Sequence, residues 1–561
     1  MKLTRQHLRY LIICIPVFAF FGFFFYYMVD APINDDYALL DFIDKCISTD
    51  SLSEKAGLIF AQHNEHRIVY DRIWTILSYK ISDSVNFTFL ALLGNLSLIG
   101  IAFLFFRKFK NLNKELLLFF PVTVLLFNIS SWENMTFAMA TLSNFTVIYF
   151  ALLSLYYLSS ETLVKKKNLF LGILFFALAI LTQGGGLFLF PLSVLILVYK
   201  KEYKNILIYL TFTLPMVFLY FYDYKSPGSS KGIVSSLIEY NFEIIPFLFA
   251  FLGNATNYYL IYTGSLKNST VLSLIFGVIF FLVFIYITYK KYYKQNLFIY
   301  SVLLFFIISA CVTSVSRVSF GLDAAGASRY RINGIIFLIA LYFWLIETYN
   351  LKKLYITITL VVTVGYFYFF SLKQVEYLDV RQKQTYTGVL MQNIGISTYL
   401  NGDKNDVTIY NMLLNNAKNS ETYCLPSNED ILDYFPYGNE HSLKPLKLST
   451  NDLAYNIDTI TELNDSYLVE GWAFLGDENT CGQKVYVGVT NGLDNTAIFY
   501  STKQYSRYDV NTFFKKNNLR FAGYLGRIRK NDLKSGENKI SLMIEVNGMT
   551  KTVLTDKKII K

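Results

Sequence analysis

Long apolar runs, separated by short polar loops, constrain this chain more than any other feature. A helix needs about 20 mostly apolar residues to cross a bilayer. Only 16% of the 561 residues are charged, whereas an ordinary soluble domain has about 25%. The pattern predicts a polytopic α-helical membrane protein with about eleven spans, at 8–28, 84–106, 115–128, 137–158, 168–182, 186–199, 205–222, 269–289, 297–315, 333–349 and 354–371.

The first apolar run, from Leu8 to Met28, is predicted to be a retained helix and not a signal peptide. It is longer and richer in Phe than the apolar core of a signal peptide. The residues that follow it contain no A-x-A pattern, which a signal peptidase would require.

Lys and Arg gather at the N-terminus and in the short loops, and this predicts the orientation. The positive-inside rule places these clusters in the cytoplasm, so the chain crosses the membrane an even number of times between them. The run 245–263 contains Pro246, Gly253, Asn254 and Asn257, and a full crossing there would break the parity. We therefore expect a re-entrant or surface-lying segment at 245–263, a cytoplasmic N-terminus, and an external chain after about residue 372.

The net charge of +10 does not indicate a nucleic-acid partner. The basic residues lie in loops between apolar runs, and no basic patch is interleaved with aromatics that could stack on bases.

The polar stretches that could carry chemistry all fall on the predicted outer face. They are "NDDY" from Asn34, "QHNEHR" from Gln62, "SWENMTF" from Ser131, "TQGGG" from Thr182 and "SRVSFGLDAAGASRYR" from Ser316. The cytoplasmic loops are short and merely basic. A protein of this kind is expected to act on something at the outer leaflet.

Adjacent carboxylates at Asp35 and Asp36 are the first candidates for acid–base chemistry. The alternative is that they cap an amphipathic interfacial helix that begins near Tyr37. His63 and His66 flank Glu65, and their i, i+3 spacing predicts that both imidazoles lie on one helical face. Two His residues make a weak metal motif without a third ligand, so hydrogen bonding to a polar substrate or to a lipid phosphate is favoured.

Four arginines, Arg67, Arg317, Arg329 and Arg331, are candidates for phosphate recognition. The planar guanidinium binds phosphate oxygens through two parallel hydrogen bonds. For Arg317, Arg329 and Arg331, the alternative role is to extend from a helix end to the lipid headgroups. Glu133 is either a substrate ligand or a loop carboxylate that faces water.

Three of these motifs, in this order, resemble a known superfamily. They are Asp-Asp-Tyr in a large first external loop (29–83), "QHNEHRIV" further along it, and a late "FGxxxAxxSRY" loop from Phe320 to Tyr330. Over residues 8–371 the chain resembles the GT-C superfamily of polytopic glycosyltransferases. More narrowly, it is similar to bacterial envelope enzymes, including the serotype-converting glucosyltransferases that modify O-antigen.

The resemblance implies an enzyme of the bacterial inner membrane. It would transfer a hexose, with glucose the first choice, from a polyprenyl-phosphate donor to a polysaccharide or lipid-linked oligosaccharide acceptor on the outer face. A flippase and a donor synthase are its implied partners, beside membrane lipid. No cofactor is certain, and a divalent metal at the acidic pair stays open. The resemblance implies the role of general base or metal ligand for Asp35 and Asp36. From the chemistry of the residues themselves, we expect donor-phosphate binding for Arg67, Arg317, Arg329 and Arg331, and substrate binding for His63, Glu65, His66, Glu133 and Tyr330.

The tail has a different composition. Residues 372–454 form a polar linker, and residues 455–561 contain short alternating runs separated by turn signals such as Asn547-Gly548. We expect an external all-β sandwich. Trp472, Tyr505 and Tyr508 are either sugar-stacking side chains or core residues, and the core reading is favoured.

Two other classes of function stay open. A transporter or lipid flippase would have charges inside its spans and internal repeats, and the sequence has few such charges and no evident repeat. A non-catalytic assembly protein that binds glycan would leave the "NDDY" and "SRYR" stretches without a role.

Overall fold

The chain forms two compact units, which are described separately. One comprises Met1–Met28 and Ala38–Leu378, and the other comprises Val29–Tyr37 and Asp379–Lys561. The computed structural model describes residues 5–561, except for 160–162, 226–232, 258–266, 350–352, 371–373, 394–399, 401–406, 428–440, 446–452, 464, 492–495, 506, 517 and 520.

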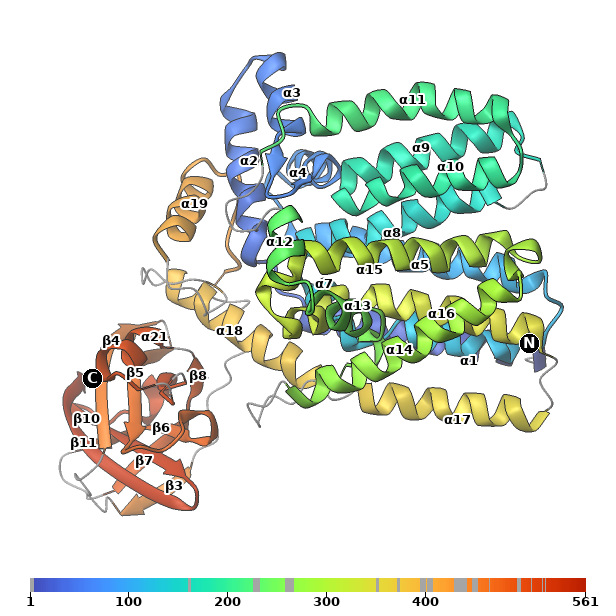
Figure 1. Ribbon diagram of the computed structural model, residues 1–561. Coiled ribbons are helices and arrows are strands. Elements are labelled where there is room, and N and C mark those ends of the chain that lie inside the picture. Colours follow the sequence, from blue (N-terminus) through green and yellow to red (C-terminus); the bar gives the residue numbers. More distant parts are fainter. Residues whose placement is uncertain are drawn as a thin grey trace. The chain divides into compact units, whose positions relative to one another are not determined.

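The first unit, called the helical unit, is a bundle of helices (Figure 1). It also contains one short hairpin. Its helices are α1 (Arg5–Tyr27), α2 (Tyr37–Ser48), α3 (Leu52–Phe60), α4 (Val69–Ser82), α5 (Phe87–Lys110), α6 (Phe120–Leu126), α7 (Trp132–Thr136), α8 (Ala138–Ser159), α9 (Lys166–Thr182), α10 (Leu189–Tyr199), α11 (Tyr203–Phe221), α12 (Ile233–Glu239), α13 (Ile244–Leu252), α14 (Lys267–Tyr289), α15 (Leu297–Arg317), α16 (Arg331–Thr348) and α17 (Lys353–Phe370). The hairpin joins β1 (Gln62–His63) to β2 (His66–Arg67).

Eight helical segments in the described part of the chain are long and apolar enough to cross a membrane. Two shorter apolar helices, at Gly184–Tyr199 and Thr357–Phe370, are also present. All eleven predicted runs are helical, which supports the multi-pass character of the protein, while the count of eleven crossings remains a prediction.

Burial explains why these helices lack a polar stripe. Of the most apolar 18-residue stretch of the central helix α8, 83% is buried inside the protein, whereas only 17% of the corresponding stretch of α11 is buried. A soluble bundle would turn polar residues outward, but α11 exposes Phe212 and Phe218 instead. Helices of this kind face lipid on the outside and protein on the inside, so they are apolar on both sides.

Helix α13 occupies the run that broke the parity of the predicted topology. It has nine residues, which at about 1.5 Å per residue is too short for a bilayer core of about 30 Å. It packs closely on α14, where a Cβ added to Gly253 would lie 1.8 Å from the Ser273 carbonyl oxygen. Residues 258–263 of the same run lie outside the described residues.

The second unit, called the C-terminal unit, contains two antiparallel sheets that share one hydrophobic core. The five-stranded sheet has the order β11-β10-β6-β7-β3, and the four-stranded sheet has the order β4-β5-β9-β8. Core residues come from both sheets, including Val469, Val487 and Leu542. The strands are β3 (His441–Pro445), β4 (Leu453–Glu462), β5 (Ser466–Leu475), β6 (Lys484–Asn491), β7 (Thr496–Ser501), β8 (Lys503–Tyr505), β9 (Gly523–Arg529), β10 (Glu537–Val546) and β11 (Met549–Ile560).

The predicted turn at Asn547-Gly548 connects β10 to β11. Both residues have positive φ, 49° and 76°, as a type I′ hairpin turn requires. The sheets begin earlier than residue 455, because β3 starts at His441. The predicted linker also contains helices: α18 (Val375–Asn393), whose first residues to Leu378 belong to the helical unit, and α19 (Val407–Asn419).

The segment Val29–Tyr37 belongs to the C-terminal unit, although the sequence suggested that it was part of the membrane domain. The Tyr423 hydroxyl donates to the Asp30 carbonyl oxygen at 2.8 Å. The rings of Tyr37 and Tyr410 meet edge to face, with centroids 5.0 Å apart. These contacts join segments that lie far apart in the sequence, so sequence patterns could not predict them.

Candidate functional site

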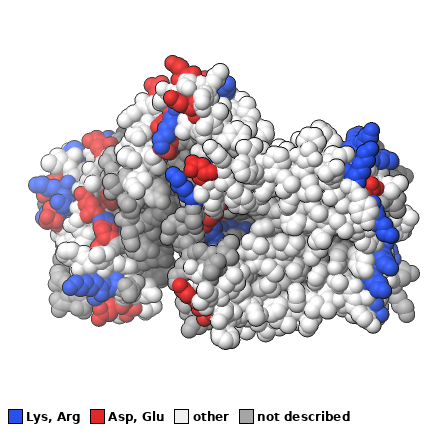
Figure 2. Space-filling view, turned by 45° about the horizontal axis from the view of Figure 1, so that its top comes forward, with Lys and Arg blue, Asp and Glu red and all other residues white. Residues whose placement is uncertain are grey.

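Basic residues gather at one end of the helical unit, called the basic end. Figure 2 shows this as a blue band along its right edge, beside a broad uncharged surface. The helices explain the band, because α5 ends at Lys110, α9 begins at Lys166, and α14 ends just before Lys290.

The opposite ends of the same helices carry the polar stretches noted in the sequence. Helix α9 ends at Thr182, α15 ends at Arg317, and α16 begins at Arg331. Contacts connect the stretches 62–67, 131–136, 182–186 and 316–331, with Asn144 as one intermediate and the approach of Gly184 to His66 as the closing contact. We call this arrangement the polar ring.

The hairpin and the 316–331 loop meet through an ion pair. Arg317 Nη2 lies 2.9 Å from Glu65 Oε1, and about a quarter of each side chain is exposed. The guanidinium also lies over the Phe320 ring, 5.7 Å from its centroid. The cation is therefore anchored by a carboxylate and an aromatic face, yet it remains accessible.

The expectation that His63 and His66 share a helical face is wrong. They are opposite each other across the β1–β2 pair, and Asn64 has a φ of 48° in the turn between them. Arg67 orders this hairpin, because its Nε donates to the Tyr220 carbonyl at 2.7 Å and its Nη1 to the Phe60 carbonyl at 2.6 Å. Its third nitrogen donates to the Tyr222 carbonyl.

His66 has a buried Nδ1. Burial lowers the pKa of this imidazole from 6.5 to about 4; the nearby Glu65 carboxylate opposes the shift, and the Arg317 guanidinium reinforces it. The ring is therefore neutral at physiological pH, which suits a hydrogen-bonding role better than a cationic one.

The His66 shift predicts a pH dependence of stability. Its folded-state pKa lies below its ordinary value, so the unfolded chain binds a proton more readily. The free energy of unfolding should fall as the pH drops from 6.5 towards about 4. We expect His66→Gln to flatten the pH dependence of the thermal unfolding midpoint in nanodiscs between pH 7 and 5. His7→Gln, on α1, is the matched control, and equal slopes for wild type and His66→Gln would contradict the prediction.

Glu133 joins the 131–136 stretch to the 316–331 loop. The Ser328 hydroxyl donates to Glu133 Oε2 at 2.7 Å, and the Arg329 backbone N–H donates to the same oxygen at 3.0 Å. The Asn134 amide donates to the Arg329 carbonyl at 2.9 Å. The backbone of Arg329 is thus fixed on both sides, while its side chain is exposed and lies over the Tyr330 ring, 5.3 Å from the centroid.

An amide chain continues the polar ring towards the glycines. Asn144 Nδ2 donates to Asn134 Oδ1 at 2.9 Å, and Gln183 Nε2 donates to Asn144 Oδ1 at 2.8 Å. The sequence analysis did not single out Asn144. The sequence did contain a clue to its role. Asn144 is an uncharged polar residue inside the apolar run 137–158, where a polar group needs a hydrogen-bonding partner.

The glycines after Gln183 close the polar ring. A Cβ on Gly184 would lie 2.9 Å from both His66 Nδ1 and the Tyr220 hydroxyl. The Tyr220 hydroxyl in turn donates to the Glu65 carbonyl at 3.3 Å. Close approach of neighbouring atoms therefore explains the glycine at position 184.

Gly186 is expected to be the least replaceable of the three glycines. A Cβ there would lie 2.4 Å from the Ala179 carbonyl carbon, whereas on Gly185 the nearest atom is Gln183 Oε1 at 3.5 Å. Because backbone cannot move aside cheaply, Gly186→Ala should destabilise the protein by about 1–3 kcal/mol. Thermal unfolding of Gly186→Ala beside Gly185→Ala tests this, and equal midpoints for the two variants would count against it.

The four candidate arginines divide into two groups. Arg67 donates to three backbone carbonyls, as described above. Arg331 is fully buried, and its Nη1 donates to the Ser130 carbonyl at 2.9 Å. These contacts favour structural roles for both, whereas Arg317 and Arg329 are accessible to an anionic ligand.

The two carboxylates of the acidic pair have different surroundings in the C-terminal unit. Asp36 is 1% exposed, and its Oδ2 accepts the Ile33 backbone N–H at 3.1 Å. Asp35 is exposed. Asp36 therefore has the capping geometry that the sequence left open as an alternative, and Asp35 is the carboxylate that a substrate can reach.

Among the residues that the structure describes, no three His, Cys, Asp or Glu side chains are grouped to hold a metal ion. His63 and His66 therefore have no third ligand of these types within the described chain.

Two of the three aromatic candidates in the C-terminal unit pack internally. The buried hydroxyl of Tyr505 donates to Glu470, and Trp472 packs against Phe474 and Phe514. The prediction that these aromatic residues belong to the core is confirmed for Tyr505. Trp472 is partly buried against a small hydrophobic cluster. The side chain of Tyr508 lies outside the described residues.

Comparison with known proteins identified no relative: no protein-family model, no curated protein and no solved structure matches this chain.

Proposed function

We propose that this chain is a membrane glycosyltransferase that moves a hexose, glucose first among them, from a polyprenyl-phosphate donor to an envelope polysaccharide such as O-antigen. The observation that carries the proposal is the polar ring. Four stretches that are distant in sequence are joined by hydrogen bonds and an ion pair at one end of an apolar bundle. Elaborate polar order at the end of a membrane bundle favours recognition of a ligand at the bilayer surface.

The reaction requires one proton transfer and one displacement. The acceptor hydroxyl oxygen attacks the anomeric carbon, the bond from that carbon to the phosphate oxygen breaks, and a carboxylate takes the hydroxyl proton. We assign the proton to Asp35, because its carboxylate is exposed. Asp36 supports the backbone turn through its bond to Ile33.

The leaving group is a lipid phosphate that gains negative charge. Cations that are already in position stabilise such charge better than mobile ones. We assign this role to Arg317 and Arg329, which are held by Glu65 and by the fixed backbone beside Glu133 respectively. His63, His66 and Tyr330 contribute hydrogen-bonding and aromatic surface for the sugar.

The remaining parts of the chain complete the proposal. Eleven spans would place the N-terminus in the cytoplasm of a bacterial cell and the C-terminal unit outside the inner membrane. The two sheets would act as a sandwich that binds the polysaccharide acceptor.

The orientation can be tested without any measurement of chemistry. A phosphatase fused after Lys561 should be active, and a fluorescent protein that folds only in the cytosol should be dark at the same position. A reporter inserted at Lys267 should also read outside. A cytosolic signal at Lys267 would mean that the run 245–263 crosses the membrane, and the parity argument would be wrong.

The function itself is tested on the polymer. Envelope polysaccharide from cells with and without the gene should differ by one hexose per repeat in mass spectrometry. Purified protein with a synthetic polyprenyl-phosphate hexose should reproduce the transfer. An unchanged polymer together with altered pools of lipid-linked sugar would contradict the enzyme and favour a transporter.

A further inference from the structure

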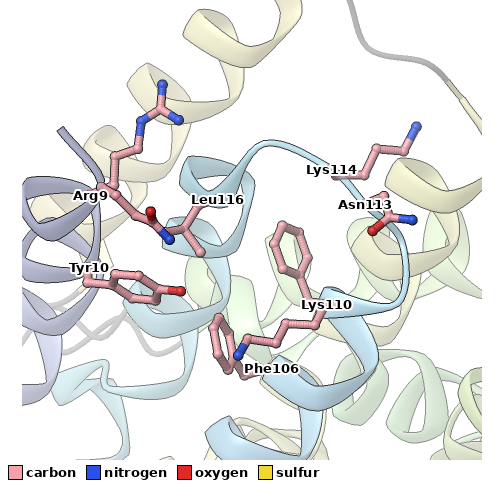
Figure 3. A pocket seen from close by; sticks show the side chains of 9 residues that line it. Arg9, Tyr10, Phe106, Lys110, Asn113, Lys114 and Leu116 are labelled. Atoms are coloured by element: carbon pink, nitrogen blue, oxygen red, sulfur yellow. The ribbon is translucent and has the colours of Figure 1, made fainter. Parts of the chain in front are cut away.

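We propose that a pocket at the basic end binds the phosphate-bearing headgroup of an anionic phospholipid. The pocket has a volume of about 420 Å³ and lies between the start of α1 and the connection from α5 to α6 (Figure 3). Its lining includes Arg9, Tyr10, Phe106, Lys110, Asn113 and Lys114.

The charge of the lining favours an anion. Three cationic side chains, Arg9, Lys110 and Lys114, line the pocket. One neighbouring carboxylate, Glu115, lies 3.1 Å from Arg9 Nη2. Three positive charges and one negative charge give a formal excess of +2, which suits one phosphate diester with further polar groups.

The geometry of the lining suits a headgroup. Figure 3 shows Arg9 and Lys114 on opposite sides of the pocket, with Tyr10, Phe106 and Lys110 along its lower edge. The rings of Tyr10 and Phe106 meet edge to face with centroids 6.4 Å apart, and Lys110 Nζ lies 5.1 Å from the Phe106 centroid. Aromatic rings beside cations are typical of the depth at which headgroups meet hydrocarbon.

The surface beside the pocket indicates a lipid and not a soluble phosphate. The same two helices expose apolar side chains close in sequence to the lining residues, with Leu11 on α1 55% exposed and Phe103 on α5 61% exposed. A ligand with its phosphate between the cations could lay acyl chains along these residues. Basic pockets between membrane helices commonly bind anionic headgroups in this way.

This site is independent of the proposed glycosyl transfer. The pocket lies at the basic end, whereas the polar ring lies at the opposite ends of the helices. Loss of lipid binding would not contradict the proposed glycosyl transfer. Loss of glycosyl transfer would not contradict the proposed lipid site.

The test is lipid binding to the full-length protein, measured by native mass spectrometry from detergent. We expect phosphatidylglycerol to bind and phosphatidylcholine to bind at least tenfold more weakly. Each cation near an anionic lipid contributes about fivefold in affinity. The double variant Lys110→Ala/Lys114→Ala should therefore bind phosphatidylglycerol about 25-fold more weakly, since two fivefold contributions multiply.

Two matched variants separate charge from general damage. Lys110→Arg/Lys114→Arg keeps both charges and should retain binding. Lys166→Ala/Lys167→Ala removes two cations of the basic end outside the pocket and should also retain it. Wild-type binding by Lys110→Ala/Lys114→Ala would overturn the proposal, and so would displacement of the lipid by millimolar inorganic phosphate, because the ligand would then be a soluble anion.

Discussion

Replacing Asp35 by Asn should abolish hexose transfer while the protein still accumulates in the membrane. Asparagine keeps the size of the side chain and removes the basic carboxylate. Loss of a general base typically lowers the rate about 10²–10⁴-fold. Asp36→Asn should have a smaller effect, because Asn can still accept the Ile33 backbone N–H that Asp36 accepts now. Transfer is measured with purified variants and a polyprenyl-phosphate hexose.

Asp41→Asn is the matched control for the acidic pair. Asp41 is on α2, a few residues further along the chain, and forms an exposed i, i+4 ion pair with Lys45 at 2.6 Å. Such a pair contributes only about 0.3–0.5 kcal/mol, so this variant should transfer at the wild-type rate. If Asp35→Asn, Asp36→Asn and the double variant all keep full activity, the acidic pair is a cap and the assigned base is wrong.

Replacing Arg329 by Ala should lower activity, whereas replacing Arg331 by Ala should lower stability. Arg329 is exposed, so Arg329→Ala should leave the stability of the fold unchanged. The free energy of binding the donor phosphate should weaken by roughly 2–5 kcal/mol if that contact is desolvated. Arg331 is fully buried and donates to the Ser130 carbonyl. Arg331→Ala leaves a cavity and an unsatisfied carbonyl, a loss of about 2–5 kcal/mol of stability.

The two arginine variants are compared by accumulation in membranes, by thermal unfolding, and by kcat/KM at varied donor concentration. Arg329→Lys keeps the charge but not the two-pronged guanidinium, so it should recover only part of the activity. Normal activity of Arg329→Ala would remove this residue from the donor site. Normal stability of Arg331→Ala would contradict its structural role.

The sequence was sufficient to predict the helices, because their signal is local. Apolar runs long enough to span a bilayer coincide with α1, α5, α8, α14 and α15. The Asn547-Gly548 turn was predictable for the same reason, since an Asn-Gly pair readily adopts the two positive φ angles that a tight hairpin turn needs and that the structure shows.

The polar ring was only partly predictable. Its charged members, such as Glu65, Glu133 and Arg317, could be recognised as unusual residues beside membrane spans. Which of them pair could not be deduced, because Glu65 and Arg317 are 252 positions apart and no periodicity connects them. Asn144 was missed, since a single amide in an apolar helix resembles an ordinary tolerated polar residue until its partners are known.

The four arginines illustrate a further limit of sequence analysis. All have the same side chain and were candidates for the same role, yet Arg67 and Arg331 donate to backbone carbonyls within the protein. Burial depends on tertiary packing, and composition does not report it. The hairpin at His63 and His66 was mistaken for a helix because an i, i+3 spacing also fits a tight turn between paired strands.

The contact between Asp30 and Tyr423 has a consequence for biosynthesis. These residues are 393 positions apart, and ribosomes add about 5–20 residues per second. The segment that contains Asp35 therefore leaves the ribosome roughly 20–80 s before its packing partner exists, at that same rate of synthesis. During this interval the nascent chain has its first membrane helices but not the finished environment of the acidic pair. A protein built in this order gains the hydrogen bond between Asp30 and Tyr423 only after residue 423 of the 561 has been added, which delays any activity that depends on this contact until that part of the C-terminal unit has been made.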